Sequence, residues 1–247
     1  MEEELLRYMK IKFLKLGGFK FSFGNTREFL AIYKDIFLLQ ANKPKLNDRK
    51  KLILDCGSHI GISVLYFKKL FPEAKVIAFE PNPENFKLLK QNINQNKLKN
   101  VGPLNMAVSD KTGTIDFYMS KGKGPWSWGD AVVKNKWYSP EKYTTIKVKA
   151  AKLSKFIEGK VDLIKLDIEG REGAVLKQIE NKLYLVDEII VEFHGSSTNP
   201  GNKFEEVLEI LRKNSFAYEI KQNGRLKEEE EVRKEDPYWV TVHAFKN

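Results

Sequence analysis

The sequence predicts an α/β protein built on a mostly parallel sheet of seven strands, with helices on both faces and the last strand antiparallel. Short apolar segments alternate with helical ones from residue 51 onward, which is typical of strand–helix–strand units on a parallel sheet. Near the end of the chain, "FAYEIK" and "YWVTVHAF" are both strand-like, and no helix separates them. A hairpin at this point requires the last strand to run against its neighbour.

The residues before this domain are expected to form a small helical extension over 1–50. Its elements are a helix over 3–16, the short strand "FKFSF" and a second helix over about 26–40, capped at Asn25 or the threonine after it. Proline, asparagine and charged residues mix in "ANKPKLNDRKK", which indicates a linker. We therefore expect an extension followed by one main domain over 51–247.

The elements of the main domain follow from its apolar periodicity. The expected strands are "KLILD", "AKVIAFE", "VGPLNMAVS", "TIDFYMS", "TTIKVKA", "VDLIKLDI" and "DEIIVEF", followed by the final pair. The expected helices are "GISVLYFKKLF", "PENFKLLKQNINQNK", "GAVLKQIENKL" and "KFEEVLEILRKN", with a short one near residues 153–157. A tryptophan-bearing loop runs to about Lys142, and the "EEEE" run is expected at a solvated hairpin tip.

Composition narrows the class of protein. No apolar run approaches the roughly 20 residues that span a bilayer, and "MEEELLRYMK" lacks the apolar core of a secretory signal. We expect a cytoplasmic protein without stable membrane insertion. The single cysteine, Cys56, excludes an intramolecular disulfide. The net charge of +10 is compatible with nucleic acid, anionic lipid or phosphorylated partners, or with a lysine- and glutamate-rich chain suited to high temperature.

The stretch "LDCGSHIGISVLYF" joins the first parallel strand to a helix. Ligands of open α/β sheets collect where strand ends meet helix N-termini, and Gly57 and Gly61 let the backbone pass close to one. Asp55 stands where a pyrophosphate-binding loop has its first glycine. Its carboxylate would repel a pyrophosphate but suits the positive amino-acid end of S-adenosylmethionine.

A second acid, Glu80, ends the next strand and is placed to accept the ribose hydroxyls. Acids also end strands as helix caps, which is the alternative for both Asp55 and Glu80. "NMAVSD" is the expected adenine contact, chiefly through Ala107 and Val108. The predicted cofactor-binding set is completed by Ser58, His59, Pro81, Asn82 and Asp167. His59 would contact the carboxylate of the ligand or satisfy the loop backbone.

From Leu52 onward the chain resembles the FkbM family of S-adenosylmethionine-dependent methyltransferases. The matching stretches are "LDCGSHIGISVLYF", "VIAFEPNPENFKLLKQNI", "NMAVSDKTGTIDFY", "VDLIKLDIEGREGAVL" and "IIVEFH". The resemblance implies a class I, Rossmann-like methyltransferase fold, whose sheet also carries one antiparallel strand near its end. It implies O-methylation of hydroxyls on natural products, sugars and similar acceptors. It also implies that Asp55, Gly57 and Glu80 bind the cofactor, and that Asp167, Glu169 and His194 line the site of transfer.

The chain departs from the family pattern in two places. Ser154 and Lys155 follow Leu153 where the family usually carries an acid, and the resemblance does not extend to the first fifty residues. We expect the extension to shape the acceptor site or a homodimer contact.

Methyl transfer to a hydroxyl is an in-line displacement that depends on alignment and gains from a base. His194 is the predicted base, since a neutral imidazole is available near pH 7; the alternative is a strand-end histidine bonded to loop backbone. Asp167 would orient the acceptor or the ammonium group of the cofactor. Glu169 lies at a helix start, where carboxylates are favoured anyway. These three with Glu192 could bind a divalent metal, but spacing cannot show that they converge, and we assign no metal.

Two other functions compete with this hypothesis. RNA methylation is the first, because residues 121–160 carry ten lysines against three acids, interleaved with tryptophan and tyrosine. The same loop could instead close over the acceptor, with Trp126 and Trp128 as a lid. The second is a nucleotide-binding protein or a nicotinamide-dependent oxidoreductase, which Asp55 argues against. A small-molecule or glycan acceptor is the first choice of partner, and RNA is the second.

Overall fold

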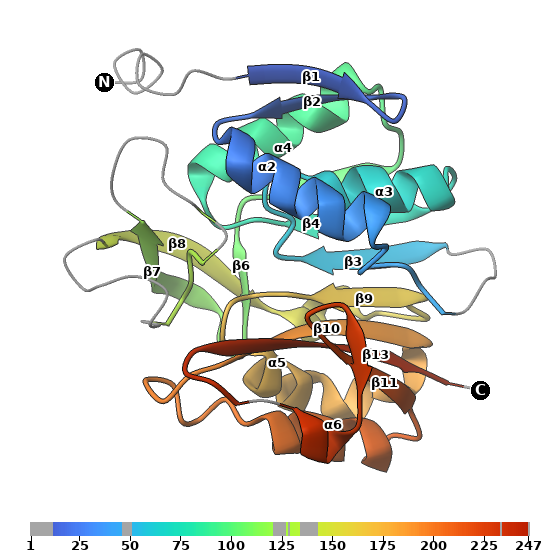
Figure 1. Cartoon of the computed structure of the whole chain (residues 1–247), viewed down its shortest axis with the longest axis vertical. Helices are drawn as coiled ribbons and strands as arrows, with labels where there is room; N and C mark the ends of the chain where they lie inside the picture. Colours follow the sequence, from blue (N-terminus) through green and yellow to red (C-terminus); the bar gives the residue numbers. More distant parts are fainter. Residues whose placement is uncertain are drawn as a thin grey trace.

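The computed structural model describes residues 12–45, 51–120, 127, 129–133, 143–232 and 234–246. Its centre is an eight-stranded mixed sheet in the order β12-β11-β13-β10-β9-β3-β4-β5 (Figure 1). The strands are β3 (Leu52–Cys56), β4 (Lys75–Phe79), β5 (Val101–Leu104), β9 (Leu163–Leu166), β10 (Glu188–Gly195), β11 (Ala217–Gln222), β12 (Arg225–Lys227) and β13 (Tyr238–Phe245). The seven strands of the predicted sheet are present, and the short β12 adds an eighth at one edge.

The directions of the strands confirm the predicted topology. β5, β4, β3, β9 and β10 are consecutive parallel neighbours, whereas β13 runs antiparallel to both β10 and β11. The chain order reverses beside β3, which pairs with β4 on one side and β9 on the other. Open sheets bind their ligands at such a switch point, outside the carboxyl ends of the strands.

Helices cover both faces of the sheet (Figure 1). On one side lie α2 (Thr26–Tyr33), α3 (Ile62–Leu70) and α4 (Pro83–Gln95), and on the other lie α5 (Glu172–Ile179) and α6 (Phe204–Lys213). Each side has its own apolar core: Phe29 and Phe67 are buried on the first, and Leu176 and Leu211 on the second. Short helices η3 (Leu153–Phe156) and η4 (Glu180–Leu185) flank α5, and η5 (Glu229–Glu231) follows β12 at the "EEEE" run. No helix in these described ranges is long and apolar enough to cross a bilayer.

The N-terminal extension differs from its prediction. The expected helix over 3–16 is wrong where the structure describes it, because Lys12–Leu16 forms strand β1 and pairs antiparallel with β2 (Phe19–Phe23). Gly17 and Gly18 connect the two strands with φ angles of 58° and 86°. Two glycines in the left-handed region are the turn that a tight hairpin requires, and this signal outweighs the helix-compatible residues before it.

The second helix of the extension forms as expected. Asn25 caps α2, because its side chain accepts hydrogen bonds from the backbone N–H groups of Arg27 and Glu28. The helix continues as a π-helical turn, η1 (Lys34–Leu38). Figure 1 shows α2 beside α3, so the extension covers the same face of the sheet as the first helices of the main domain.

The segment "VGPLNMAVS" forms two strands instead of one. β5 ends at Leu104, and β6 (Ala107–Ser109) joins β8 (Tyr143–Lys152) and β7 (Gly113–Ser120) in a separate three-stranded sheet. The side chain of Asn105 donates to the carbonyl oxygens of Glu80 and Pro81 at 2.8 and 3.1 Å. These bonds fasten the turn between the strands to the end of β4.

Candidate functional site

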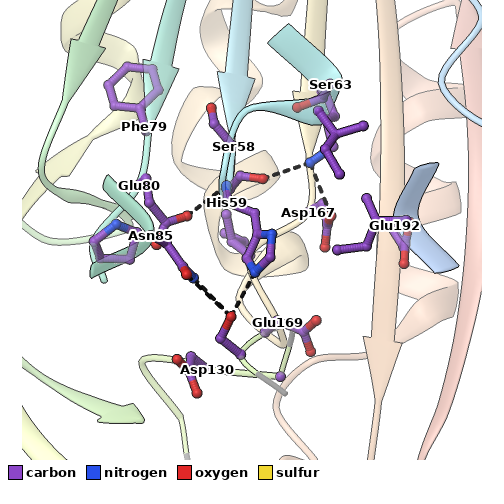
Figure 2. A pocket seen from close by; sticks show the side chains of 18 of the residues that line it. Ser58, His59, Ser63, Phe79, Glu80, Asn85, Asp130, Asp167, Glu169 and Glu192 are labelled. Atoms are coloured by element: carbon purple, nitrogen blue, oxygen red, sulfur yellow. Dashed lines mark hydrogen bonds and ion pairs between the residues drawn. The ribbon is translucent and has the colours of Figure 1, made fainter. Parts of the chain in front are cut away.

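A cavity of about 420 Å³ opens beyond the carboxyl ends of β3, β4, β9 and β10. The loops after these strands line it, together with β6, described residues between 127 and 132, and the start of β13. Helix α2 and turn η1 of the N-terminal extension complete its wall through Ala31, Ile32, Asp35 and Ile36. Figure 2 shows carboxylates converging on this space from both ends. The extension therefore contributes side chains to the lining of the site.

Most of the predicted site residues line this cavity. They are Gly57, Ser58, His59, Glu80, Pro81, Ala107, Val108, Asp167, Glu169 and His194. The predicted residues outside its lining are Asp55, Gly61 and Asn82. The tryptophans expected as a lid, Trp126 and Trp128, lie outside the described residues, as do all the lysines from 121 to 142.

Both predicted loop glycines are required, but by contacts within the protein. Gly57 has a φ of +82°, and a Cβ there would lie 1.8 Å from the carbonyl oxygen of Asp167. Gly61 has a φ of +89°, and its Cβ would lie 2.6 Å from the side chain of Leu89 in α4. The first glycine thus lets the loop after β3 approach the end of β9, and the second lets α3 begin against α4.

Asp55 lies behind the wall of the cavity. Its side chain is fully buried; Oδ2 accepts a hydrogen bond from Ser63 Oγ at 2.6 Å, and Oδ1 lies 3.6 Å from Lys165 Nζ. Burial raises the pKa of Asp55, while Lys165 and the serine bonds work in the opposite direction. The carboxylate therefore acts on the cavity through Ser63 and Lys165, which both line it.

Lys165 links the end of its own strand, β9, to the loop after β3. Its Nζ donates to the carbonyl oxygen of Gly57 at 2.8 Å and to Asp167 Oδ2 at 3.0 Å. Burial lowers the pKa of Lys165, but Asp167 and Asp55 outweigh burial, so the net pKa is raised and the ammonium group is retained. A buried lysine is rare unless it is paired, so the lysine inside the apolar strand "VDLIKLDI" was a usable signal that the sequence analysis missed.

Glu80 occupies the end of β4 with both carboxylate oxygens directed by backbone groups. Oε2 accepts from the N–H of His59 and Oε1 from the N–H of Asn82, each at 2.8 Å. Burial raises the pKa of Glu80 to about 7, although His59 and the two backbone bonds oppose this shift. Each carboxylate oxygen can accept more than one hydrogen bond, so Glu80 can still receive hydroxyl donors from the cavity.

Apolar side chains line the cavity together with Glu80 and are called its apolar slot. They are Phe79, Ala107, Val108, Phe117 and Val132. Asp130 borders the same end, where Oδ2 accepts from the side chain of Asn82 at 2.8 Å and Oδ1 from the N–H of Ser120 at 2.8 Å. Burial raises the pKa of Asp130 to about 7. An apolar slot beside a carboxylate suits a nucleoside, whose base is apolar on its faces and whose ribose donates hydrogen bonds.

His59 connects this end of the cavity to the N-terminal extension. Its Nε2 lies 2.7 Å from Ser127 Oγ and 3.5 Å from Glu28 Oε1 of helix α2. Burial lowers the pKa of His59, but the charges of Glu28, Glu80 and Asp130 raise it by more, so its net pKa is raised. Glu28 was not predicted, because nothing in the local sequence relates it to a loop 31 positions away.

Four ionisable side chains meet at the other end of the cavity: Asp167, Glu169, Glu192 and His194. His194 Nε2 lies 3.4 Å from Glu169 Oε1 and 3.8 Å from Glu192 Oε1. One ligand-type atom from each of Asp167, Glu192 and His194 lies within 4.8 Å of the others. These side chains therefore converge in the fold, which their spacing in the sequence could not show. The ammonium group of Lys165 lies beside them and is paired with Asp167.

The charges around His194 work against the neutral imidazole that the sequence analysis assumed. Burial lowers the pKa of His194, but Glu169, Glu172 and Asp167 outweigh burial and raise it well above its usual value. These three carboxylates favour the imidazolium form over the neutral imidazole that the prediction assumed. Burial raises the pKa of Glu192 to about 7 and that of Glu169 well above its usual value.

Comparisons with known proteins agree with this geometry. Residues 55–218 match the family described as the methyltransferase FkbM domain. The methyltransferase sdnD of Sordaria araneosa is 30% identical over 193 residues, which cover 65% of this chain and 73% of that protein. The hexuronic acid methyltransferase AglP of Haloferax volcanii is 28% identical over 178 residues, covering 70% of this chain and 66% of that protein. The crystal structure of methyltransferase FkbM from Methylobacillus flagellatus KT has a TM-score of 0.54 at 14% identity, over 85% of this chain and 47% of that one, and shows the shared fold.

Proposed function

Because this chain belongs to the FkbM family of methyltransferases, we propose that it transfers a methyl group from S-adenosylmethionine to a hydroxyl of a sugar, glycan or other small-molecule acceptor. The observation that carries the proposal is the cavity itself. One space joins the Glu80 carboxylate and its apolar slot to the cluster around His194. The name of the Haloferax volcanii relative, a hexuronic acid methyltransferase, supports a sugar among the acceptor classes.

The donor set at the first end fits S-adenosylmethionine. Glu80 would accept the ribose hydroxyls, and Ala107 and Val108 would contact the adenine together with Phe79 and Phe117, which line the same slot. Asp167, beside the loop of Gly57, would hold the ammonium end of the amino-acid moiety. When bound, the cofactor supplies a methyl group on an electrophilic sulfonium.

The second end would bind the acceptor and take up its proton. Ile32, Asp35 and Ile36 of the extension and Trp239 of β13 line the same cavity as His194 and Glu192, and they would contact the acceptor. The hydroxyl proton would pass to the group of His194, Glu169 and Glu192, whose basic sites lie within a few ångströms of one another. General-base assistance of this kind adds roughly 10²–10⁴ in rate.

The cofactor assignment is tested by calorimetric titration of S-adenosylhomocysteine against NAD. We expect micromolar binding of the first and none of the second, and a loss of about ten- to a hundredfold in affinity on Glu80→Ala, the range for hydrogen bonds to a charged group. Glu158→Gln is the control, because Glu158 is exposed and is not part of the cavity lining. Binding of NAD in place of S-adenosylhomocysteine would contradict the proposal.

The acceptor class is tested by labelling a fractionated lysate with tritiated S-adenosylmethionine, with and without ribonuclease. Label that survives ribonuclease in a glycan, lipid or small-molecule fraction supports the proposal. Label that ribonuclease removes would favour RNA methylation, the alternative that the lysine-rich 121–160 stretch suggests. Steep loss of binding with salt would accompany that outcome.

A further inference from the structure

Glu172 is fully buried at the start of α5, directly behind His194. Its Oε1 lies 3.3 Å from His194 Nδ1 and also accepts from the backbone N–H of Gly170 at 2.9 Å. Its Oε2 accepts from the side chain of Asn202 at 2.8 Å. The carboxylate therefore ties the helix start, the turn after β9 and the imidazole ring together.

Asn202 reinforces this arrangement from the segment before α6. Its Nδ2 donates to Glu172 and also to the carbonyl oxygen of His194, at 2.9 Å. Its Oδ1 accepts from the N–H of Gly173 at 3.0 Å. Both Asn202 and Glu172 are buried, so neither can exchange these partners for water without opening the structure.

The contacts separate the two nitrogens of His194. Nδ1 faces Glu172, and Nε2 faces the cavity, where Glu169 and Glu192 lie. A base whose second nitrogen donates to a buried carboxylate is held in one tautomer and one ring orientation, as in hydrolytic triads. We propose that Glu172, supported by Asn202, is the positioning residue that keeps Nε2 of His194 directed at the acceptor hydroxyl. The inference rests on the proposed function for the identity of the hydroxyl, but not for the orientation of the ring.

A purely structural role explains only part of the geometry. A carboxylate at a helix start is stabilised by exposed N–H groups, which accounts for the bond from Gly170. It does not account for the bond to Nδ1, nor for the asparagine that contacts both Glu172 and the backbone of His194. The distinction is measurable on the imidazole itself.

The test uses ¹⁵N NMR of histidine-labelled protein, in the full chain loaded with S-adenosylhomocysteine. The chain has three histidines, and His194→Gln assigns the relevant signal by its loss. In the parent, the hydrogen that remains after deprotonation should sit on Nδ1. In Glu172→Gln the Nε2–H form should dominate. The titration midpoint of the ring should also fall by about one pH unit or more, because the variant removes the charge of Glu172. The other carboxylates that face the ring, Asp167, Glu169 and Glu192, remain.

Matched variants keep the inference open to contradiction. Glu158→Gln should leave the ring signals unchanged, and Asn202→Ala should shift the tautomer ratio in the same direction as Glu172→Gln, by less. If Glu172→Gln does not fold, Asn202→Ala decides alone. Unchanged ring signals in a folded but less stable variant would overturn the positioning role.

Activity provides the second readout. With the labelled acceptor fraction, Glu172→Gln should lower kcat by roughly 10²–10⁴ and displace the pH profile, with the acceptor KM and the affinity for S-adenosylhomocysteine changed less than about threefold. Failure of the parent to bind S-adenosylhomocysteine would count against the proposed function, whereas the same NMR comparison in the unloaded chain would still decide the orientation of His194.

Discussion

His59 and Glu28 form an ion pair, with Nε2 and Oε1 3.5 Å apart, that joins the loop after β3 to the N-terminal extension. Their side chains are 17% and 7% exposed, so the pair is largely shielded from solvent. Ser127 contacts both residues. The ion pair therefore joins the extension to the loop whose backbone donates to Glu80. Loss of the pair should disturb the end of the cavity that contains Glu80.

Glu28→Gln is predicted to lower the free energy of unfolding by roughly 1–3 kcal/mol, the range for buried hydrogen bonds to charged groups. The pKa of His59 is raised in the folded protein. The contribution of His59 to the free energy of unfolding is therefore complete below about pH 6.5 and is lost as pH rises through the raised pKa. The pKa of Glu28 is lowered, so its contribution is present above about pH 4.5 and is lost as pH falls. Denaturant titrations should show the largest difference from the parent between these two values, and an equal difference at pH 9 would contradict the pairing. Glu158→Gln should show none.

Glu80 is predicted to make cofactor binding pH-dependent. Only the ionised carboxylate accepts hydroxyl donors on both oxygens, and its pKa is about 7. The affinity for S-adenosylhomocysteine should therefore rise about tenfold between pH 6 and pH 8, measured by calorimetry, and this rise should flatten in Glu80→Gln. Asp130 titrates in the same range, so Asp130→Asn is the reference that should keep the dependence; a flat parent profile would refute the role of Glu80.

Gly57→Ala is predicted to destabilise the protein by more than about 3 kcal/mol, because its Cβ would lie 1.8 Å from the carbonyl oxygen of Asp167 at a φ of +82°. Gly102→Ala is the control, since a Cβ there meets no atom within 4 Å. Urea unfolding of both variants measures the difference. Equal midpoints would show that the loop relaxes without strain.

Trp239→Ala is predicted to act on the acceptor alone. Trp239 is 42% exposed, lines the cavity and pairs with His194 across β13 and β10. Removing a large aromatic wall should raise the acceptor KM about tenfold or more and leave S-adenosylhomocysteine affinity within about threefold. Tyr184→Ala, which removes an aromatic ring that is 75% exposed, is the control. If Trp239→Ala also lowered the affinity for S-adenosylhomocysteine by the same factor, Trp239 would act on the cofactor as well, which would contradict the prediction.

Sequence patterns identified the parallel strands, and most of the site residues predicted from them line the cavity. Glu80, Asp167 and His194 each stand at or just beyond the end of an apolar segment, and the carboxyl ends of parallel strands meet at one edge of the sheet. Residues far apart in the chain could therefore be grouped from their positions at strand ends alone. The same reasoning failed for Lys12–Leu16, where residue preference was weaker than the two-glycine turn beyond it.

The sequence by itself determined the parallel strands with their antiparallel end, the loop glycines and the acid that ends β4, because these depend on local periodicity and on the geometry common to parallel sheets. Only the tertiary structure decided which way Asp55 faces, that Glu28 and Asp35 of the extension reach the site, and which charges surround His194. Burial and the distances between charges set the protonation state of a side chain, and both arise from packing between segments. His194 has carboxylates from separate segments around it, and those neighbours raise its pKa.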